Sequence, residues 1–411
     1  MFHRKSLWTC QPFILEIDKE LMNKKSLLII FLVVFIDLLG FGMIIPILPY
    51  YAKFFGASGT VLGLLMMSYS AMQFIFAPVW GRLSDRIGRR PVLLATIAGI
   101  GGSMLILGAA QSLLWLFAGR LLAGFFGANI STASAYIADI TPPESRAKGM
   151  GMIGAAFGLG FLFGPALGGF LSQWGYGTAA WGAAGLSFCN VIFAFFQLKE
   201  PPLTEEVRKL HRHRADKKAW LQTLTEPKTG LPIFLFFLVT TGIAQLETTF
   251  ALFLLARFGL DAQHAGTILA AMAVVMVAVQ GGGIGKLVRI FGEPTLVMMG
   301  TALMAIGLLA ASNSMQLSWF IVALLFHALG YGMTNPTLSS LVSKNAPQGT
   351  QGATMGVYQS AGSLARIVGP LLAGILFDHG GIQVPFWVAS GIFSAALLIS
   401  VRRPKSIRSP A

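Results

Sequence analysis

The sequence predicts an all-α, polytopic membrane protein with twelve transmembrane helices in two pseudo-symmetric six-helix bundles. Three observations lead to this prediction: the composition, a series of long uncharged runs, and an internal repeat. The 411 residues are 55% hydrophobic and only 11% charged, and their mean hydropathy is +0.71. A water-soluble domain does not carry so much apolar sequence. Inside lipid, only helices can satisfy the backbone groups along such runs.

The uncharged runs set the order of the elements. Each run has about the 20 residues that a helix needs to cross a hydrocarbon core of about 30 Å. The expected spans are 26–50, 60–80, 91–110, 113–137, 148–172, 178–198, 230–255, 263–284, 294–311, 316–342, 352–377 and 384–401. The same boundaries predict a cytoplasmic extension (1–25), a first bundle (26–198), a basic cytoplasmic linker (199–229), a second bundle (230–403) and a cytoplasmic tail (404–411).

The internal repeat supports the division into two halves. Glycines and prolines of spans four and five recur 205 residues later, in spans ten and eleven. The matching pairs are Gly127 and Gly332, Pro142 and Pro347, Gly151 and Gly356, Gly164 and Gly369, Pro165 and Pro370, and Gly169 and Gly374. Parallel repeats of this kind place a substrate site near the bilayer midplane, between the halves.

The net charge of +14 indicates topology and not a nucleic-acid partner. Nearly all of the 30 Lys and Arg residues lie in gaps that would face one side of the membrane. The positive-inside rule identifies that side, and both termini, as cytoplasmic. The two cysteines, Cys10 and Cys189, predict neither a disulfide nor a metal site. Because Met22 directly precedes the first span, we expect residues 1–21 to be dispensable or to arise from an upstream start.

A basic segment between the second and third spans carries the most specific pattern. Residues 81–90 are expected to form an aqueous turn with tight backbone at its glycines. The pattern consists of Gly81, Asp85, Arg86, Gly88, Arg89 and Arg90. It resembles the loop 2–3 signature of the major facilitator superfamily. The chain as a whole resembles the drug:proton antiporters of that superfamily, close to the tetracycline and multidrug exporters. This resemblance implies the major facilitator fold, and a cytoplasmic gate formed by Asp85, Arg86 and Asp139.

Four ionisable residues lie inside the predicted spans: Asp37, Arg120, Glu247 and Arg366. A charge at the bilayer centre costs about 2.5 to 3.5 kcal/mol on insertion scales, so each should face a cavity or a partner. By resemblance, Asp37 matches the coupling acid of the tetracycline/proton antiporters, and Glu247 matches an acid implicated in export by Gram-positive multidrug exporters. Arg120 resembles the family arginine that assists proton transfer. Structural ion pairing between helices is the alternative role for all four.

The fifth span carries a motif of small residues: Gly160, Gly164, Pro165, Gly168 and Gly169. Glycines at four-residue spacing form a smooth stripe for close helix approach, and the proline permits a kink. The motif resembles one associated with antiporters as opposed to uptake symporters. Further polar residues could line the cavity or merely bridge helices; these are Gln73, Asn129, Gln245, Asn335 and Gln359.

Together these patterns predict a monomeric secondary transporter of the inner (plasma) membrane that exports drug-like amphipathic compounds in exchange for protons. Its partners would be a small-molecule substrate, protons and the lipid bilayer. No nucleotide-binding loop is present, so we expect no cofactor and no metal, with the proton gradient as the energy source. The alternatives are an exporter of an endogenous metabolite or siderophore, an uptake symporter and, in another class, a membrane-embedded enzyme or receptor. The sequence does not choose between narrow and broad specificity.

Overall fold

The computed structural model describes residues 11–141, 146–201, 223–346 and 351–401. Within these ranges the chain consists of helices and short connections, and twelve helical stretches are long and apolar enough to cross a membrane. The predicted all-α, polytopic fold class is therefore confirmed. The predicted tail and most of the predicted linker lie outside the described residues.

The helices before the linker form the first group of elements. They are α1 (Gln11–Ile44), α2 (Leu48–Phe54), α3 (Gly59–Ile87), α4 (Arg89–Gly108), α5 (Leu113–Phe126), α6 (Asn129–Ile140), α7 (Arg146–Leu171), the short η1 (Ser172–Trp174) and α8 (Tyr176–Gln197). Two spans are interrupted. The first breaks between α1 and α2, where Pro49 stands in the first turn of α2. The fourth breaks at Gly127, between α5 and α6.

The helices after the linker form the second group. They are α11 (Pro227–Phe258), α12 (Ala262–Ala278), the π-helical turn η2 (Val279–Gly283), α13 (Ile284–Phe291), α14 (Glu293–Asn313), α15 (Leu317–Asn345), α16 (Gln351–Gly380) and α17 (Val384–Val401). The segments α12, η2 and α13 together make one span. Three consecutive glycines lie in the π-helical turn between them.

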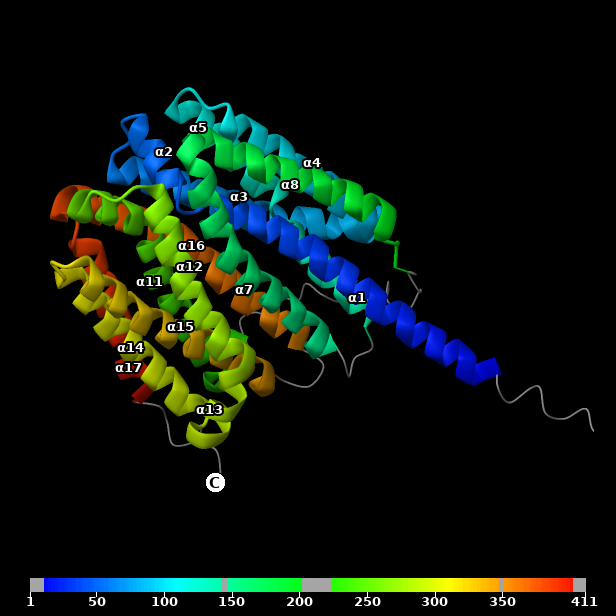
Figure 1. The fold of residues 1–411 in the computed structure, drawn as a ribbon. Helices are drawn as coiled ribbons and strands as arrows, with labels where there is room; N and C mark the ends of the chain where they lie inside the picture. Colours follow the sequence, from blue (N-terminus) through cyan, green and yellow to red (C-terminus); the bar gives the residue numbers. More distant parts are fainter. Residues whose placement is uncertain (1–10, 142–145, 202–222, 347–350, 402–411) are drawn as a thin grey trace, which may run out of the picture.

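Each group packs mainly within itself, and two pairs of helices make most of the contacts between the groups (Figure 1). In the first group α1 packs on α7 and α8, and in the second α11 packs on α16 and α17. The largest contacts between the groups are those of α3 with α16 and of α7 with α12, and α11 also contacts α2 and α3. The repeated glycines serve equivalent packing: a Cβ on Gly164 would lie 2.7 Å from Gly42 in α1, and a Cβ on Gly369 would lie 2.7 Å from Ala244 in α11.

The two groups meet closely at one end of the helices, which we call the distal end because it lies opposite the linker. A Cβ on Gly59 would lie 2.9 Å from the carbonyl oxygen of Gly374 in α16. A Cβ on Gly266 would lie 3.1 Å from Gly169 in α7. Such short distances leave room for no side chain, so only glycine permits this approach.

The end next to the linker is looser at the equivalent helices. Gly81 in α3, Gly151 in α7, Gly285 in α13 and Gly356 in α16 have no neighbour within 4 Å of an added Cβ. In the described part of the chain, close glycine contacts between the groups therefore lie at the distal end.

The predicted turn at residues 81–90 is much shorter than expected. Helix α3 continues through Ile87, and α4 begins at Arg89. Only Gly88 lies between them, and its φ of 106° requires glycine. The physical reason is that the charged residues after the apolar run 60–80 also favour or tolerate helix, so α3 continues for nearly two turns beyond the end of that run.

Candidate functional site

A small cavity lies where the two groups of helices face each other. Its volume is about 30 Å³, which is room for about one water molecule. The lining residues come from both groups: Phe41, Ile44, Ile45, Leu48, Met66, Tyr69, Ser70, Arg120, Ala244, Glu247, Thr248, Arg366 and Pro370. Three of the four ionisable residues singled out from the sequence are thus brought together, although up to 246 positions separate them along the chain.

Arg120 holds one side of this cavity from α5. Its side chain is only 4% exposed, and its guanidinium carbon lies 4.6 Å from the centre of the Tyr69 ring. This is a cation–π contact, which stabilises a buried positive charge without neutralising it. The Nε atom of Arg120 has no hydrogen-bond partner. The cavity therefore contains a desolvated cation with spare donor capacity.

Glu247 and Arg366 line the cavity from α11 and α16, two helices of the second group that pack on each other. The charge of Arg366 acts on the carboxyl group of Glu247, but among the described residues no ion pair of 4.0 Å or less joins the two side chains. Both side chains are half-buried. A carboxyl group in this position can take up or release a proton, because no fixed ion pair locks it in one state.

Asp37 lies outside the cavity lining, beside the break in the fourth span. Its Oδ2 accepts a hydrogen bond of 3.1 Å from Nδ2 of Asn129, the first residue of α6. The other carboxyl oxygen and Oδ1 of Asn129 are both buried without a partner. The charge of Asp37 acts on Tyr69, the same residue whose ring contacts the guanidinium of Arg120.

The other polar residues expected near the substrate lie elsewhere. None of the five is among the residues that line the cavity. Gln73 donates to the carbonyl oxygen of Gly127 at 2.8 Å, and so supports the break between α5 and α6. Gln245 is fully buried, with both amide atoms unpartnered, whereas Asn335 is half-buried and Gln359 is exposed.

The glycine motif of α7 serves two neighbours at once. An added Cβ on Gly160 would lie 2.9 Å from Leu38 in α1, and one on Gly168 would meet Met43 of the same helix. On another face, Gly169 approaches Ala262 of α12, with an added Cβ 3.0 Å from its carbonyl oxygen. The motif therefore packs α7 against its own group and also against the other group.

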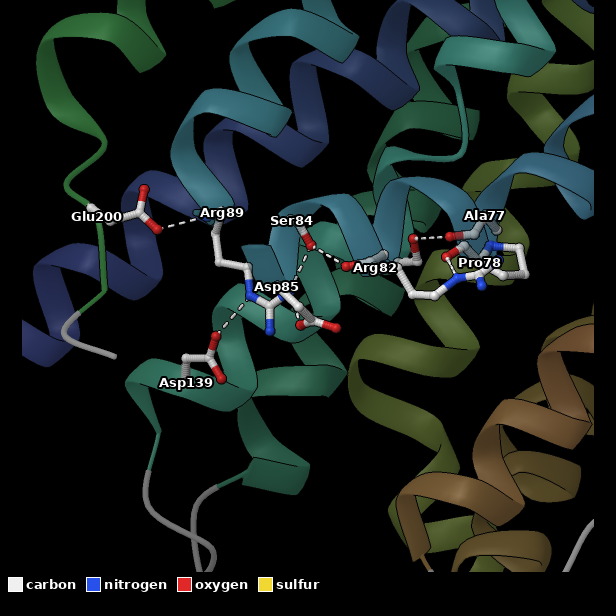
Figure 2. A network of polar contacts seen from close by, with 10 residues as sticks. Ala77, Pro78, Arg82, Ser84, Asp85, Arg89, Asp139 and Glu200 are labelled. Atoms are coloured by element: carbon white, nitrogen blue, oxygen red, sulfur yellow. Dashed lines mark hydrogen bonds and ion pairs between the residues drawn. The ribbon is translucent and has the colours of Figure 1, made fainter. Parts of the chain in front are cut away.

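A second polar cluster lies at the end next to the linker (Figure 2). Arg89 is its centre: the side chain is 1% exposed, and it contacts Asp85 at 2.6 Å, Asp139 at 2.9 Å and the Ser84 hydroxyl at 2.6 Å. Arg86, which the sequence suggested for this role, is exposed. These contacts of the Arg89 side chain all lie within the first group of helices.

Glu200 is a member of this cluster that the sequence did not suggest. Its carboxylate accepts hydrogen bonds from the backbone N–H groups of Arg89 at 2.6 Å and Arg90 at 2.9 Å. These amides are the free donors at the start of α4, where negative charge is favoured. The sequence shows an acid just after the sixth span, which could have suggested a role for Glu200 at this end of the helices. Its hydrogen-bond partner Arg90 lies 110 residues earlier, so the sequence could not identify it.

Twelve apolar helices with a charged cavity between two groups define a membrane transporter, and comparison with known proteins gives its family. The chain matches the model of the Major Facilitator Superfamily over residues 30–370 and 284–411. The chain therefore belongs to the Major Facilitator Superfamily, which confirms the resemblance seen in residues 81–90.

Relatives of known name extend over nearly the whole chain. The class E tetracycline resistance protein of Escherichia coli is 31% identical over 387 residues, which cover 92% of this chain and 95% of that protein. Multidrug resistance protein 2 of Bacillus subtilis (strain 168) is also 31% identical, with the same coverage. These relatives carry the names of resistance proteins and not of enzymes.

Solved structures share the fold. The human organic anion transporter TETRAN has a TM-score of 0.70 at 25% identity and covers 92% of this chain and 99% of its own. A bacterial homologue of the lysosomal transporter Spinster, in an inward-facing and occupied conformation, has a TM-score of 0.75 at 16% identity and covers 94% of this chain and 98% of its own. The second likeness concerns the fold alone.

Proposed function

We propose that this protein is a proton-coupled antiporter that exports drug-like amphipathic compounds across the cytoplasmic membrane by alternating access. The observation that carries the proposal is the cavity itself, where Arg120, Glu247 and Arg366 from the two groups of helices meet at apolar walls. The names of the tetracycline and multidrug resistance relatives support a drug-like substrate.

The end next to the linker would face the cytoplasm. Described basic residues gather at the helix ends on that side, and an excess of Lys and Arg is typical of the cytoplasmic side of a membrane protein; they include Arg86, Arg89, Arg90, Arg289 and Lys344. With the two groups in close contact at the distal end, loading from inside the cell would require them to separate at the end next to the linker. Rocking of the two groups about the cavity would expose it to the other side.

Glu247 and Asp37 would have different roles in transport, because they lie at different positions in the structure. Glu247 lines the cavity and would respond directly to a bound substrate. Asp37 lies beside the break between α5 and α6, away from the lining. A proton arriving at Asp37 would change the charge next to the helix break in the fourth span, and so would favour one arrangement of the helices over the other.

The test is transport in proteoliposomes with an imposed pH gradient. Tetracycline and ethidium are followed in parallel for the parent protein and for Asp37→Asn and Glu247→Gln. Gradient-driven movement of either compound, with loss of movement in Asp37→Asn, is the expected result. If neither compound moves and neither releases protons from the parent protein, drug export is refuted and a carrier of an endogenous metabolite becomes the better interpretation.

A further inference from the structure

We propose that the cavity selects amphipathic organic anions, with the anionic group held by Arg120 and Arg366. The proposal rests on the proposed export function and names its substrate class. It is argued from the charges that line the cavity, from the lack of a partner for Arg120, and from the apolar walls.

The charges lining the cavity do not balance. Its permanently charged groups are two guanidinium groups, Arg120 and Arg366, and its single carboxyl group is that of Glu247. The sum is positive when Glu247 is ionised, and more positive when it is protonated, because arginine does not lose its proton in proteins. A cationic drug would therefore enter a site of its own sign in either state.

Arg120 differs from the other deeply buried arginine of this chain. Arg89 is equally desolvated, yet it is ion-paired with both Asp85 and Asp139. Among the described residues Arg120 has no carboxylate within ion-pairing distance, and its Nε lacks a partner. A buried charge without a counter-ion is costly, so this guanidinium is poised to receive an anion from outside the protein.

The walls of the cavity indicate the rest of the ligand. Phe41, Ile44, Leu48 and Met66 offer an apolar surface, and the Tyr69 ring already lies against a guanidinium. Guanidinium binds carboxylate through two parallel hydrogen bonds. The matching ligand is a carboxylate on an aromatic or aliphatic body. Since the cavity holds about 30 Å³, such a ligand enters only as the two groups of helices move apart.

The test uses three probes with the same aromatic body and different charges: pyrenebutyrate, pyrenebutanol and pyrenebutylamine. Equilibrium binding to the full-length protein in lipid nanodiscs is measured by fluorescence anisotropy at neutral pH. We expect pyrenebutyrate to bind about tenfold to hundredfold more tightly than the alcohol, and the amine to bind most weakly. In Arg120→Gln the affinity for pyrenebutyrate should fall to that for the alcohol.

Three further variants keep the result interpretable. Arg120→Lys retains the charge and should retain part of the preference, even if Arg120→Gln fails to fold. Glu247→Gln removes the opposing charge and should tighten pyrenebutyrate binding several-fold. Arg257→Gln removes an arginine near the distal end of α11 that contacts Met315 outside the cavity, and should leave the preference unchanged.

The proposal is overturned if the parent protein binds the amine as tightly as the carboxylate, if it binds none of the probes, or if Arg120→Gln keeps the preference. Such a result leaves the export function standing when ethidium still moves with the pH gradient. Loss of all gradient-driven transport would instead refute the export function itself, so the two failures are distinguishable.

Discussion

Asp378 closes the distal end of the protein by binding a helix of the opposite group, and its replacement should shift the balance between conformations. Its carboxylate accepts three hydrogen bonds of 2.7 Å, from the backbone N–H groups of Gly59 and Thr60 and from the Thr60 hydroxyl. It therefore caps the first turn of α3 from the last turns of α16. When the groups separate, this cap is lost.

The free-energy cost of Asp378→Ala follows from the hydrogen bonds that the variant loses. Loss of a helix cap costs about 0.5 to 2 kcal/mol, and a neutral hydrogen bond adds about 0.5 to 1.5 kcal/mol. The site is exposed, and Ser58 still caps the same helix by accepting from the backbone N–H of Val61, so we take about 1 to 2 kcal/mol for Asp378→Ala. This corresponds to about a 5- to 30-fold change in the equilibrium constant. A separated state populated at about 1% would rise to between about 5% and 25%.

The assay is double electron–electron resonance in nanodiscs, with spin labels at the distal end of each group. Lys53→Cys and Gln316→Cys are exposed positions for the labels, in a background in which Cys10 and Cys189 are replaced by serine. Asp378→Ala should increase the population at long distance. An unchanged distance distribution would refute the idea that this carboxylate holds the groups together.

Asp261→Ala is the matched control. Asp261 caps α12 from within its own group, by accepting from the backbone N–H of His264 at 3.1 Å. Partial burial acts to raise the pKa of Asp261, but hydrogen bonds from His264 outweigh it and hold the pKa below its usual range. This carboxylate is therefore also charged at neutral pH. Because the hydrogen bond from His264 to Asp261 lies within the second group of helices, Asp261→Ala should not change the distances between the spin labels.

Three other substitutions test the packing and the polar cluster. Arg89→Gln should destabilise the protein by about 3 to 5 kcal/mol, since it removes the cation of a buried ion pair with Asp139. Thermal unfolding in detergent should show this loss, whereas Arg86→Gln, at an exposed position, should leave the melting temperature unchanged. Glu200→Ala should cost about 1 to 2 kcal/mol by uncapping α4, and the same assay would contradict the capping role if stability stayed the same. Gly164→Leu should abolish transport in proteoliposomes, because the new side chain forces α7 away from α1. Gly154→Leu should remain active, because an added Cβ at Gly154 meets nothing within 4 Å. Equal activity of the two variants would argue against close packing of α7 on α1.

The number and order of the spans could be predicted because they depend on local composition. Runs of uncharged residues have the length of the bilayer core, and this needs no knowledge of distant contacts. Helix ends were less predictable: α1 begins at Gln11 and α3 ends at Ile87, both beyond their apolar runs. Polar residues that favour or tolerate helix are not distinguished by hydropathy from those in loops.

The site could be predicted only in part, because its chemistry depends on pairing over long distances. Charged residues inside apolar runs identified Arg120, Glu247 and Arg366, which the structure brings to one cavity. Hydropathy could not reveal that Asp378 reaches α3, 319 residues away, or that Glu200 reaches α4, 111 residues away. Both acids lie at helix ends, where a charge carries no penalty that would single it out.

The most direct test of proton-coupled exchange is proton movement driven by substrate alone. Proteoliposomes containing a pH-sensitive dye in their lumen receive a transported compound on one side, with no pH gradient imposed. The parent protein should move protons in the direction opposite to the compound, and Glu247→Gln should abolish or strongly reduce this movement. Substrate movement without any proton movement in the parent protein would contradict the exchange mechanism.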